Sequence, residues 1–425
     1  MFEMDEAVVQ GVPLRVWKST PPSLRVVLES SRDRGDEVFL VYATERPPER
    51  RGAEGADERL TFDRHFRSAA TLARRLVDEH GVAKGDRVAI AMRNFPDWSV
   101  AFWAAASAGA VVVPLNAWWT AAELEYGLRD SGATVLFCDA ERYERLEGEL
   151  DDLGLSAVVV AKPGDADLRH GARSFEEVVG DIDELAELPD VAIDPDDDAT
   201  IFYTSGTTGA PKGALGTHRN ICGNLISLVF AQARSALRAG GDAAGAAGDR
   251  SQNAYLLSVP FFHATGCHSI LVANLAFGGK IVIMHKWDPE RALELIERER
   301  VTTFGGVPSM VWQVLESPSL ATRDISSVRS IGYGGAPAPP ELVRRIEALF
   351  PGRSPSNGYG LTETSSVTTM NAGIDYQRHP DSVGVAVPVC DVQVVDDEGA
   401  PMPTGSVGEL WIRGPNVVKG YWGKP

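Results

Sequence analysis

The segment Thr204–Gly213, T-S-G-T-T-G-A-P-K-G, combines the residue types that a polyphosphate requires. It contains three glycines, four hydroxyl side chains and Lys212. Glycines let backbone N–H groups approach an anion, hydroxyls donate further hydrogen bonds, and the lysine supplies the opposite charge. A strand-like run, Ala199–Tyr203, precedes the segment, and an amphipathic helical pattern begins at Thr217. The sequence therefore predicts a phosphate-binding loop between a strand and a helix.

This loop differs from a Walker A motif, which requires adjacent Gly and Lys followed by Ser or Thr. Here Ala210 and Pro211 separate Gly209 from Lys212, and Gly213 follows the lysine. The spacing excludes that NTPase motif. A glycine-rich turn with a solvated lysine is the alternative, and the clustered hydroxyls favour the phosphate loop.

A second segment with phosphate chemistry is Asn357–Thr364, N-G-Y-G-L-T-E-T. Its Thr362 hydroxyl could donate to a phosphate, and its Glu363 carboxylate could hold Mg²⁺, which prefers oxygen ligands. The alternative is a strand–helix turn in which Glu363 complements a helix N-terminus.

Two further loops could line a cleft. Gly334–Pro337, G-G-A-P, exposes backbone against which a planar base could lie, although an ordinary turn before a helix would have the same composition. Pro260–Gly266, P-F-F-H-A-T-G, places His263 between aromatic and small residues, where it could orient a carboxylate. A hydrogen-bonded interior histidine is the alternative, and His268 is expected to be structural.

Glycines also stand at the end of a predicted strand in Thr303–Pro308, T-F-G-G-V-P. Glycine within a strand often marks a place where a ligand or another backbone approaches closely. Gly305 and Gly306 are therefore candidates for the wall of a binding pocket.

Composition describes an acidic globular protein. The 425 residues carry a net charge of −18, with 44% hydrophobic and 24% charged residues. Such acidity disfavours nucleic acid, which needs clustered Lys and Arg, so an anionic ligand must be held by local donors. The four cysteines form no C-x-x-C pair, and no apolar run approaches a membrane span. Unpaired thiols and an N-terminus without an apolar signal core predict a cytoplasmic protein.

Strand-like and helix-like patterns alternate along most of the chain. The expected strands are Arg87–Met92, Ala110–Leu115, Ala133–Cys138, Ser156–Ala161, Ala199–Tyr203, Ala254–Val259, Lys280–Met284, Thr302–Phe304 and Arg329–Tyr333. The expected helices include Pro96–Ala108, Thr120–Arg129, Pro289–Arg300 and Pro340–Phe350. Short apolar strands that alternate with helices predict parallel sheets covered on both faces.

These patterns predict an α/β protein of two α/β lobes with mainly parallel sheets, 1–198 and 199–384, and a small antiparallel β-barrel, 385–425. The barrel rests on the short strands Val392–Val395 and Glu409–Ile412, which flank turn signals without a helix. Arg46–Glu58 and Ala239–Asp249 are expected to be loops, because they are rich in charged or small residues.

Three motifs, in order, resemble the adenylate-forming superfamily, which includes acyl-CoA synthetases, amino-acid adenylation domains and beetle luciferase. They are T-S-G-T-T-G-A-P-K-G, Y-G-L-T-E-T, and G-E-L-W-I-R-G-P with G-Y-W. The resemblance runs from about Leu60 to the last residue. It implies two α/β lobes and a small β-barrel that together form a large N-terminal domain.

The resemblance also implies roles for individual residues. Those that would hold the β- and γ-phosphates of ATP are Thr204, Ser205, Gly206, Thr207, Thr208, Gly209 and Lys212. Those that would form the adenine pocket and its aromatic wall are Gly335, Ala336, Pro337, Gly358, Tyr359 and Gly360. Thr362 would contact the α-phosphate, and Thr207 and Glu363 would hold Mg²⁺. The implied catalytic set is Lys212, Thr207, Glu363 and His263.

The implied reaction is attack of a carboxylate on the α-phosphorus of ATP, which releases pyrophosphate, followed by displacement of AMP from the acyl-adenylate by CoA. His263 would lie beside the carboxylate, with Gly266, Gly305 and Gly306 lining the substrate pocket. Amino-acid-activating members usually place an aspartate within the segment corresponding to Pro260–Gly266, and none stands there. A fatty or aryl acid is therefore expected.

In the superfamily, a ribose-binding aspartate, a hinge and a mobile domain with the adenylation lysine follow the point where G-Y-W-G-K-P ends this sequence. Lys424 does not match that lysine, so we expect a large N-terminal domain that turns over poorly alone. A ligase that passes the adenylate to an amine or a carrier-protein thiol is an alternative, as is a non-catalytic binding module for acyl groups or acyl-adenylates. The sequence leaves the oligomeric state open.

Overall fold

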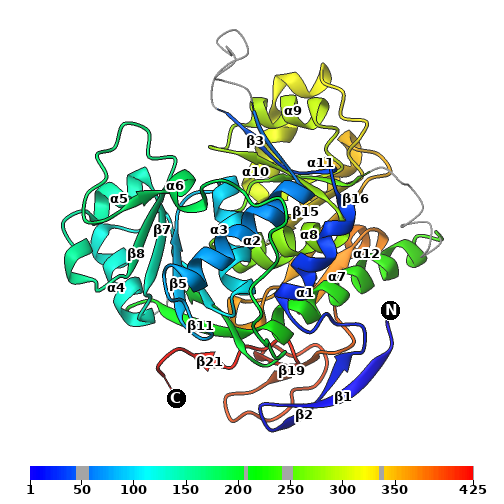
Figure 1. Cartoon of the computed structure of the whole chain (residues 1–425). Helices are drawn as coiled ribbons and strands as arrows, with labels where there is room; N and C mark the ends of the chain where they lie inside the picture. The colour runs from blue at the N-terminus through cyan, green and yellow to red at the C-terminus, as the bar shows by residue number, and fades with distance from the viewer. Residues whose placement is uncertain (45–56, 205–208, 242–251, 335–338, 425) are drawn as a thin grey trace.

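Two large β-sheets, with helices between and outside them, form the body of the molecule (Figure 1). A computed structural model describes residues 1–44, 57–204, 209–241, 252–334 and 339–424. The helices of this part of the chain are α1 (Leu24–Ser30), α2 (Phe62–Asp78), α3 (Pro96–Ser107), α4 (Ala121–Ser131), α5 (Ala140–Leu146), α6 (Phe175–Val179), α7 (His218–Arg238), α8 (Ala273–Phe277), α9 (Pro289–Arg298), α10 (Pro308–Glu316), α11 (Pro340–Leu349) and α12 (Ile374–Arg378).

The first sheet is parallel at its centre and antiparallel at one edge. Its strand order is β21 (Gly420–Tyr421), β11 (Lys212–Thr217), β10 (Asp198–Thr204), β6 (Val111–Pro114), β5 (Arg87–Ala91), β7 (Val135–Asp139), β8 (Ala157–Ala161) and β9 (Arg173–Ser174). Strand β10 runs parallel to β6, whereas β11 runs antiparallel to both β10 and β21. The carboxyl end of β10, at Thr204, therefore lies at the same edge as those of the central strands.

The second sheet has the same mixed character. Its strand order is β18 (Val385–Ala386), β17 (Thr369–Ala372), β16 (Ser354–Tyr359), β15 (Ser330–Gly334), β14 (Thr303–Gly306), β12 (Ala254–Leu257), β13 (Lys280–Met284), β3 (Val38–Ala43) and β4 (Glu58–Thr61). The strands from β16 to β3 are parallel, and the outer strands pair antiparallel. Ligands of such sheets bind beyond the carboxyl ends of the parallel strands.

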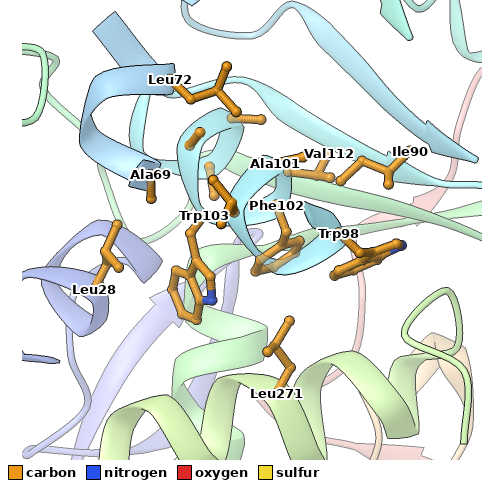
Figure 2. Packing of buried hydrophobic residues seen from close by; sticks show 14 of the residues in the cluster. Leu28, Ala69, Leu72, Ile90, Trp98, Ala101, Phe102, Trp103, Val112 and Leu271 are labelled. Atoms are coloured by element: carbon orange, nitrogen blue, oxygen red, sulfur yellow. The ribbon is translucent and has the colours of Figure 1, made fainter. Parts of the chain in front are cut away.

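A buried layer of helices connects the two sheets. Every residue of α3 is buried, and its rings Trp98, Phe102 and Trp103 belong to a cluster that includes strand residues of both sheets. Figure 2 shows these rings above Leu271 and below residues of the first sheet. A helix that is apolar all round must be enclosed by protein on all sides. This shared core fixes one sheet relative to the other.

The small antiparallel elements lie at the lower side of the molecule (Figure 1). Strands β1 (Met4–Val9) and β2 (Val12–Trp17) form one hairpin, and β19 (Asp391–Val395) and β20 (Glu409–Arg413) form a separate pair. Arg413 donates to the Pro13 carbonyl at 2.9 Å and joins the two pairs. Antiparallel structure is thus present where a small barrel was predicted, although β18 and β21 join the large sheets instead.

The predicted α/β class with mainly parallel sheets is confirmed, and the predicted lobe boundary does not coincide with the division between the sheets. Strands β10 and β11 follow residue 198 in sequence and belong to the first sheet, whereas β3 and β4 belong to the second. The reason is that sequence order does not determine which strands pair.

The predicted loops Arg46–Glu58 and Ala239–Asp249 lie largely outside the described residues. None of the described helices is long and apolar enough to span a bilayer.

Gly305 allows β14 and β15 to approach each other closely. A Cβ built at Gly305 would lie 1.5 Å from the Gly332 carbonyl oxygen, whereas one built at Gly223 in α7 would meet nothing within 4 Å. We expect Gly305→Ala to lower the free energy of unfolding by about 1–3 kcal/mol. The control Gly223→Ala should raise it by about 0.5–1 kcal/mol. Urea unfolding measures both, and equal effects would contradict the packing argument.

His65, on α2, is a buried histidine that should make the stability of the protein depend on pH. It pairs with Ser99 at 2.8 Å, and burial lowers the pKa of its ring from 6.5 to about 3. Below pH 6.5 the unfolded chain therefore binds a proton that the folded chain does not, which lowers stability by about 1.4 kcal/mol per pH unit.

We expect the difference in unfolding free energy between wild type and His65→Gln to shrink by about 2 kcal/mol between pH 6.5 and pH 5. Urea titrations at the two pH values measure it, and a difference that stays constant would be the contrary result.

Candidate functional site

The predicted phosphate loop connects two antiparallel strands. Thr204 ends β10 and pairs with Lys212, the first residue of β11, and Ser205–Thr208 lie outside the described residues. The prediction of a strand–loop–helix unit was therefore wrong in one respect, because β11 intervenes before α7 begins at His218. The signal for β11 is weak, since K-G-A-L-G-T has two glycines. Gly213 is needed because a Cβ there would lie 2.5 Å from an Ile201 methyl carbon.

The base of this hairpin is held by hydrogen bonds to α4. Tyr126 donates to the Pro211 carbonyl at 3.0 Å, and Tyr203 donates to the Asp130 carboxylate at 2.7 Å. The Trp422 indole donates to the Asp130 carbonyl at 2.9 Å. These bonds fix both strands of the hairpin and hence the position of Lys212.

Thr362 and Glu363 lie in a tight turn beyond the end of β16. Residues Thr362–Thr364 form one 3-10 turn, and the Leu361 amide donates to the Thr364 hydroxyl at 2.8 Å. Gly360 is required because a Cβ there would lie 1.4 Å from the Ser366 carbonyl oxygen. The turn leaves Thr362 and Glu363 half-buried while the residues that follow are buried.

Residues 414–422, here called the strap, join the phosphate hairpin to the Glu363 turn. The Val418 amide donates to the Glu363 carbonyl at 3.0 Å, and the Lys419 amide donates to the Leu215 carbonyl at 2.9 Å. The buried Asn220 side chain donates to the Pro415 and Val417 carbonyls at 2.7 and 2.9 Å. The strap thus holds two distant motifs side by side.

Tyr421, in the strap, contacts both charged residues of the site. Its hydroxyl donates to Glu363 Oε1 at 2.7 Å, and the Lys212 Nζ atom lies 5.2 Å from the centre of its ring. All three side chains are half-buried. The structure therefore brings together Lys212 and Glu363, which the sequence placed in separate motifs.

The nucleotide end of the predicted site lies at neighbouring strands of the second sheet. Gly334 pairs with Gly358 where β15 and β16 run parallel, so these two strands end side by side at the same edge of the sheet. A Cβ built at Gly358 would make only ordinary contacts, at 3.8 Å or more. Gly335, Ala336 and Pro337 lie outside the described residues.

His263 is exposed and lies just before the π-helix η6 (Thr265–Val272), with its ring centre 4.9 Å from that of Phe262. The segment is held in place by Asn94, which donates to the Val259 carbonyl at 3.1 Å and accepts from the Phe261 amide at 2.8 Å. His263 is thus not the interior histidine of the alternative interpretation.

His268 is the buried histidine of this region. It contacts the Ser365 carbonyl at 3.3 Å, and burial lowers the pKa of its ring to about 4. A neutral ring behind the Glu363 turn agrees with the structural role expected for it.

The three glycines predicted to line the substrate pocket face nearby protein atoms where a side chain would otherwise stand. A Cβ at Gly266 would lie 2.0 Å from the Pro260 carbonyl oxygen, and one at Gly306 would lie 2.4 Å from the Ser258 hydroxyl. Gly305 faces the Gly332 backbone in the same way. Close packing against backbone atoms at Gly266 and Gly305, and against side chains at Gly306, accounts for these glycines, and their part in a substrate pocket stays a prediction.

The fold and the site together define a class of protein, an α/β protein with a glycine-rich hairpin beside an acidic turn at the carboxyl ends of its strands. The family described as AMP-binding enzyme matches residues 29–422. The chain belongs to this family, and the predicted resemblance is confirmed.

Two curated relatives and one solved structure illustrate the similarity. The feruloyl-CoA synthase of Amycolatopsis sp is 33% identical, with 93% of this chain and 73% of the relative covered. The long-chain-fatty-acid–CoA ligase of Bacillus subtilis (strain 168) is 30% identical, with 91% and 70% covered. The long-chain-fatty-acid-CoA ligase FadD1 of Archaeoglobus fulgidus superposes with a TM-score of 0.78 at 26% identity, covering 95% of this chain and 77% of that one. The predicted class of acyl-CoA synthetase-type ligases is confirmed.

The residues that sequence reasoning missed are those that assemble the site. Asn220 forms a capping box with Thr217 at the start of α7, a local pattern, but nothing in the sequence shows that its side chain also bonds the Pro415 and Val417 carbonyls. Buried Asn416 donates to the Thr364 carbonyl at 3.2 Å, a contact between distant segments without a local signal. Tyr421 lay within the recognised G-Y-W motif but had no role assigned to it.

Asn220 provides a test of the strap. In Asn220→Asp, a carboxylate would face the Pro415 and Val417 carbonyls in a buried position, so we expect stability to fall by about 2–4 kcal/mol. The exposed, equally isosteric change Asn253→Asp should stay within about 0.5 kcal/mol of wild type. Thermal and urea unfolding measure both variants, and a wild-type-like Asn220→Asp would contradict the proposed anchoring.

Proposed function

We propose that this chain binds ATP and a fatty or aryl acid and promotes formation of the acyl-adenylate, from which CoA takes the acyl group. The observation that carries the proposal is the convergence of Lys212 and Glu363 on Tyr421 at the hairpin. The CoA ligases among the relatives support the reaction type.

Lys212 and the hairpin donors would hold the β- and γ-phosphates. With a net charge of −18, the chain as a whole repels an anion, so binding must come from local donors. Thr204 and Gly209, the described residues on either side of Ser205–Thr208, are proposed to bind these phosphates together with that segment. The chain needs no nucleophile of its own, because alignment of the two anions and stabilisation of charge lower the barrier.

Thr362 would donate to the α-phosphate, where the carboxylate of the acid attacks. His263 would orient that carboxylate from the turn before η6. The strand ends that carry Gly358, Tyr359 and Gly360, with Gly335–Pro337 beside them, are the proposed adenine pocket.

The Glu363 carboxylate fits a magnesium ion that is also bound by phosphate oxygens. No group of three or more His, Cys, Asp or Glu side chains suited to a metal occurs in the described part of the chain. Mg²⁺ often uses one or two carboxylates together with substrate phosphates and water, so a single glutamate suffices. When bound, the ion would neutralise phosphate charge. Thr207 is the second proposed ligand.

The acid would enter beside the aromatic residues that precede His263. Trp118 is 57% exposed, and its ring centre lies 5.0 Å from that of Phe262 in an edge-to-face contact. The names of the relatives include an aryl acid and a fatty acid. The apolar rings support either class of acid.

The four free, buried cysteines support the cytoplasmic location expected from the sequence.

Lys212→Ala tests the proposed phosphate site. We expect its dissociation constant for Mg²⁺–ATP to rise about tenfold or more, because a charge-assisted contact to phosphate is lost. Lys286→Ala, which removes an exposed lysine from the loop after β13, is the matched control and should bind as wild type does. Isothermal titration calorimetry measures both, and unchanged ATP affinity of Lys212→Ala would refute the site.

A further inference from the structure

Tyr421 contacts both charged groups of the proposed ATP site, Lys212 and Glu363. The Lys212 Nζ atom lies 5.2 Å from the centre of the tyrosine ring, and the hydroxyl donates to Glu363 Oε1 at 2.7 Å. Within the described residues, no ion pair joins Lys212 directly to Glu363. The Lys212 ammonium therefore lies over the face of the tyrosine ring, whereas the Glu363 carboxylate accepts a hydrogen bond from the tyrosine hydroxyl.

This arrangement matters because Lys212 and Glu363 have opposite charges. A half-buried lysine and glutamate that could reach each other would attract strongly. Such an ion pair would compete with phosphate for the lysine and with a metal ion for the carboxylate. A cation–π contact and a bond to a neutral hydroxyl hold each group more weakly. Both can then exchange their protein partner for a ligand.

The backbone around Tyr421 keeps the ring in place. Tyr421 pairs with Ala214 across β21 and β11, and the next residue, Trp422, donates its amide to the Gly213 carbonyl at 2.7 Å. The Trp422 indole is bonded to the Asp130 carbonyl in addition. The ring is thus fixed to the same hairpin that carries Lys212.

We propose that Tyr421 is a positioning residue that keeps Lys212 and Glu363 apart and available, the lysine for phosphate and the carboxylate for the magnesium ion. This inference rests on the proposed function.

Two substitutions separate the two contacts. Tyr421→Phe keeps the ring beside Lys212 and removes the bond to Glu363, so it should weaken Mg²⁺–ATP binding about fivefold and leave magnesium-free ATP binding within about twofold. Tyr421→Leu removes both contacts and lets Lys212 pair with Glu363. It should weaken magnesium-free ATP binding as well, by about tenfold.

The decisive variant is Tyr421→Leu combined with Glu363→Gln. If Tyr421 acts as a spacer, removal of the carboxylate frees Lys212, and magnesium-free ATP affinity returns to within about twofold of wild type. A merely structural tyrosine would give no such recovery. The control Tyr143→Phe deletes a hydroxyl on α5 that bonds to the Arg169 backbone, and it should bind ATP as wild type does.

Calorimetry with ATP, with and without Mg²⁺, on the whole chain decides between the outcomes, and thermal unfolding checks that each variant is folded. The inference is overturned if Tyr421→Phe weakens both forms of ATP equally, or if the double variant fails to recover. If Tyr421→Leu does not fold, the selective effect of Tyr421→Phe decides alone. Wild-type protein that binds no ATP would instead refute the proposed function itself.

Discussion

The enclosed helix α3 is the constraint on which the rest of the structure depends. Its aromatic rings pack against strands of both sheets. Movement of either sheet would expose these rings to water and lose the free energy gained by burying them. The carboxyl ends of the parallel strands are consequently held in a fixed relation. Loops from both sheets can then contribute to one site with polar groups placed to within hydrogen-bond distance.

Above this apolar layer, polar bonds between distant segments position the charges. The hairpin that carries Lys212 is held by α4 from one side and by the strap from the other. The Glu363 turn contacts the same strap through its backbone. An acidic protein can bind an anion in this way because short-range donors outweigh the screened repulsion of distant charges.

Much of the fold could be predicted because its signals are local. Lys280–Met284 is a strand with the predicted bounds, and the helix predicted from Thr120 is α4, which begins with a capping box of Thr120 and Glu123. Strand β11 could not be predicted, since its glycine-rich sequence is extended only through pairing with β10 and β21. The candidate site was visible as motifs, yet the contact between Lys212 and Glu363 through Tyr421 depends on tertiary structure.

The strap also sets an order of assembly during synthesis. Tyr421 follows Lys212 by about 200 residues, which a ribosome adds in roughly 10–40 s at about 5–20 residues per second. During that interval the hairpin can pair within itself, but its outer edge has neither β21 nor the bonds of Trp422. A nascent chain that has not reached Tyr421 therefore lacks the contacts of this residue with Lys212 and Glu363, and the proposed nucleotide site is completed only after the strap has been added.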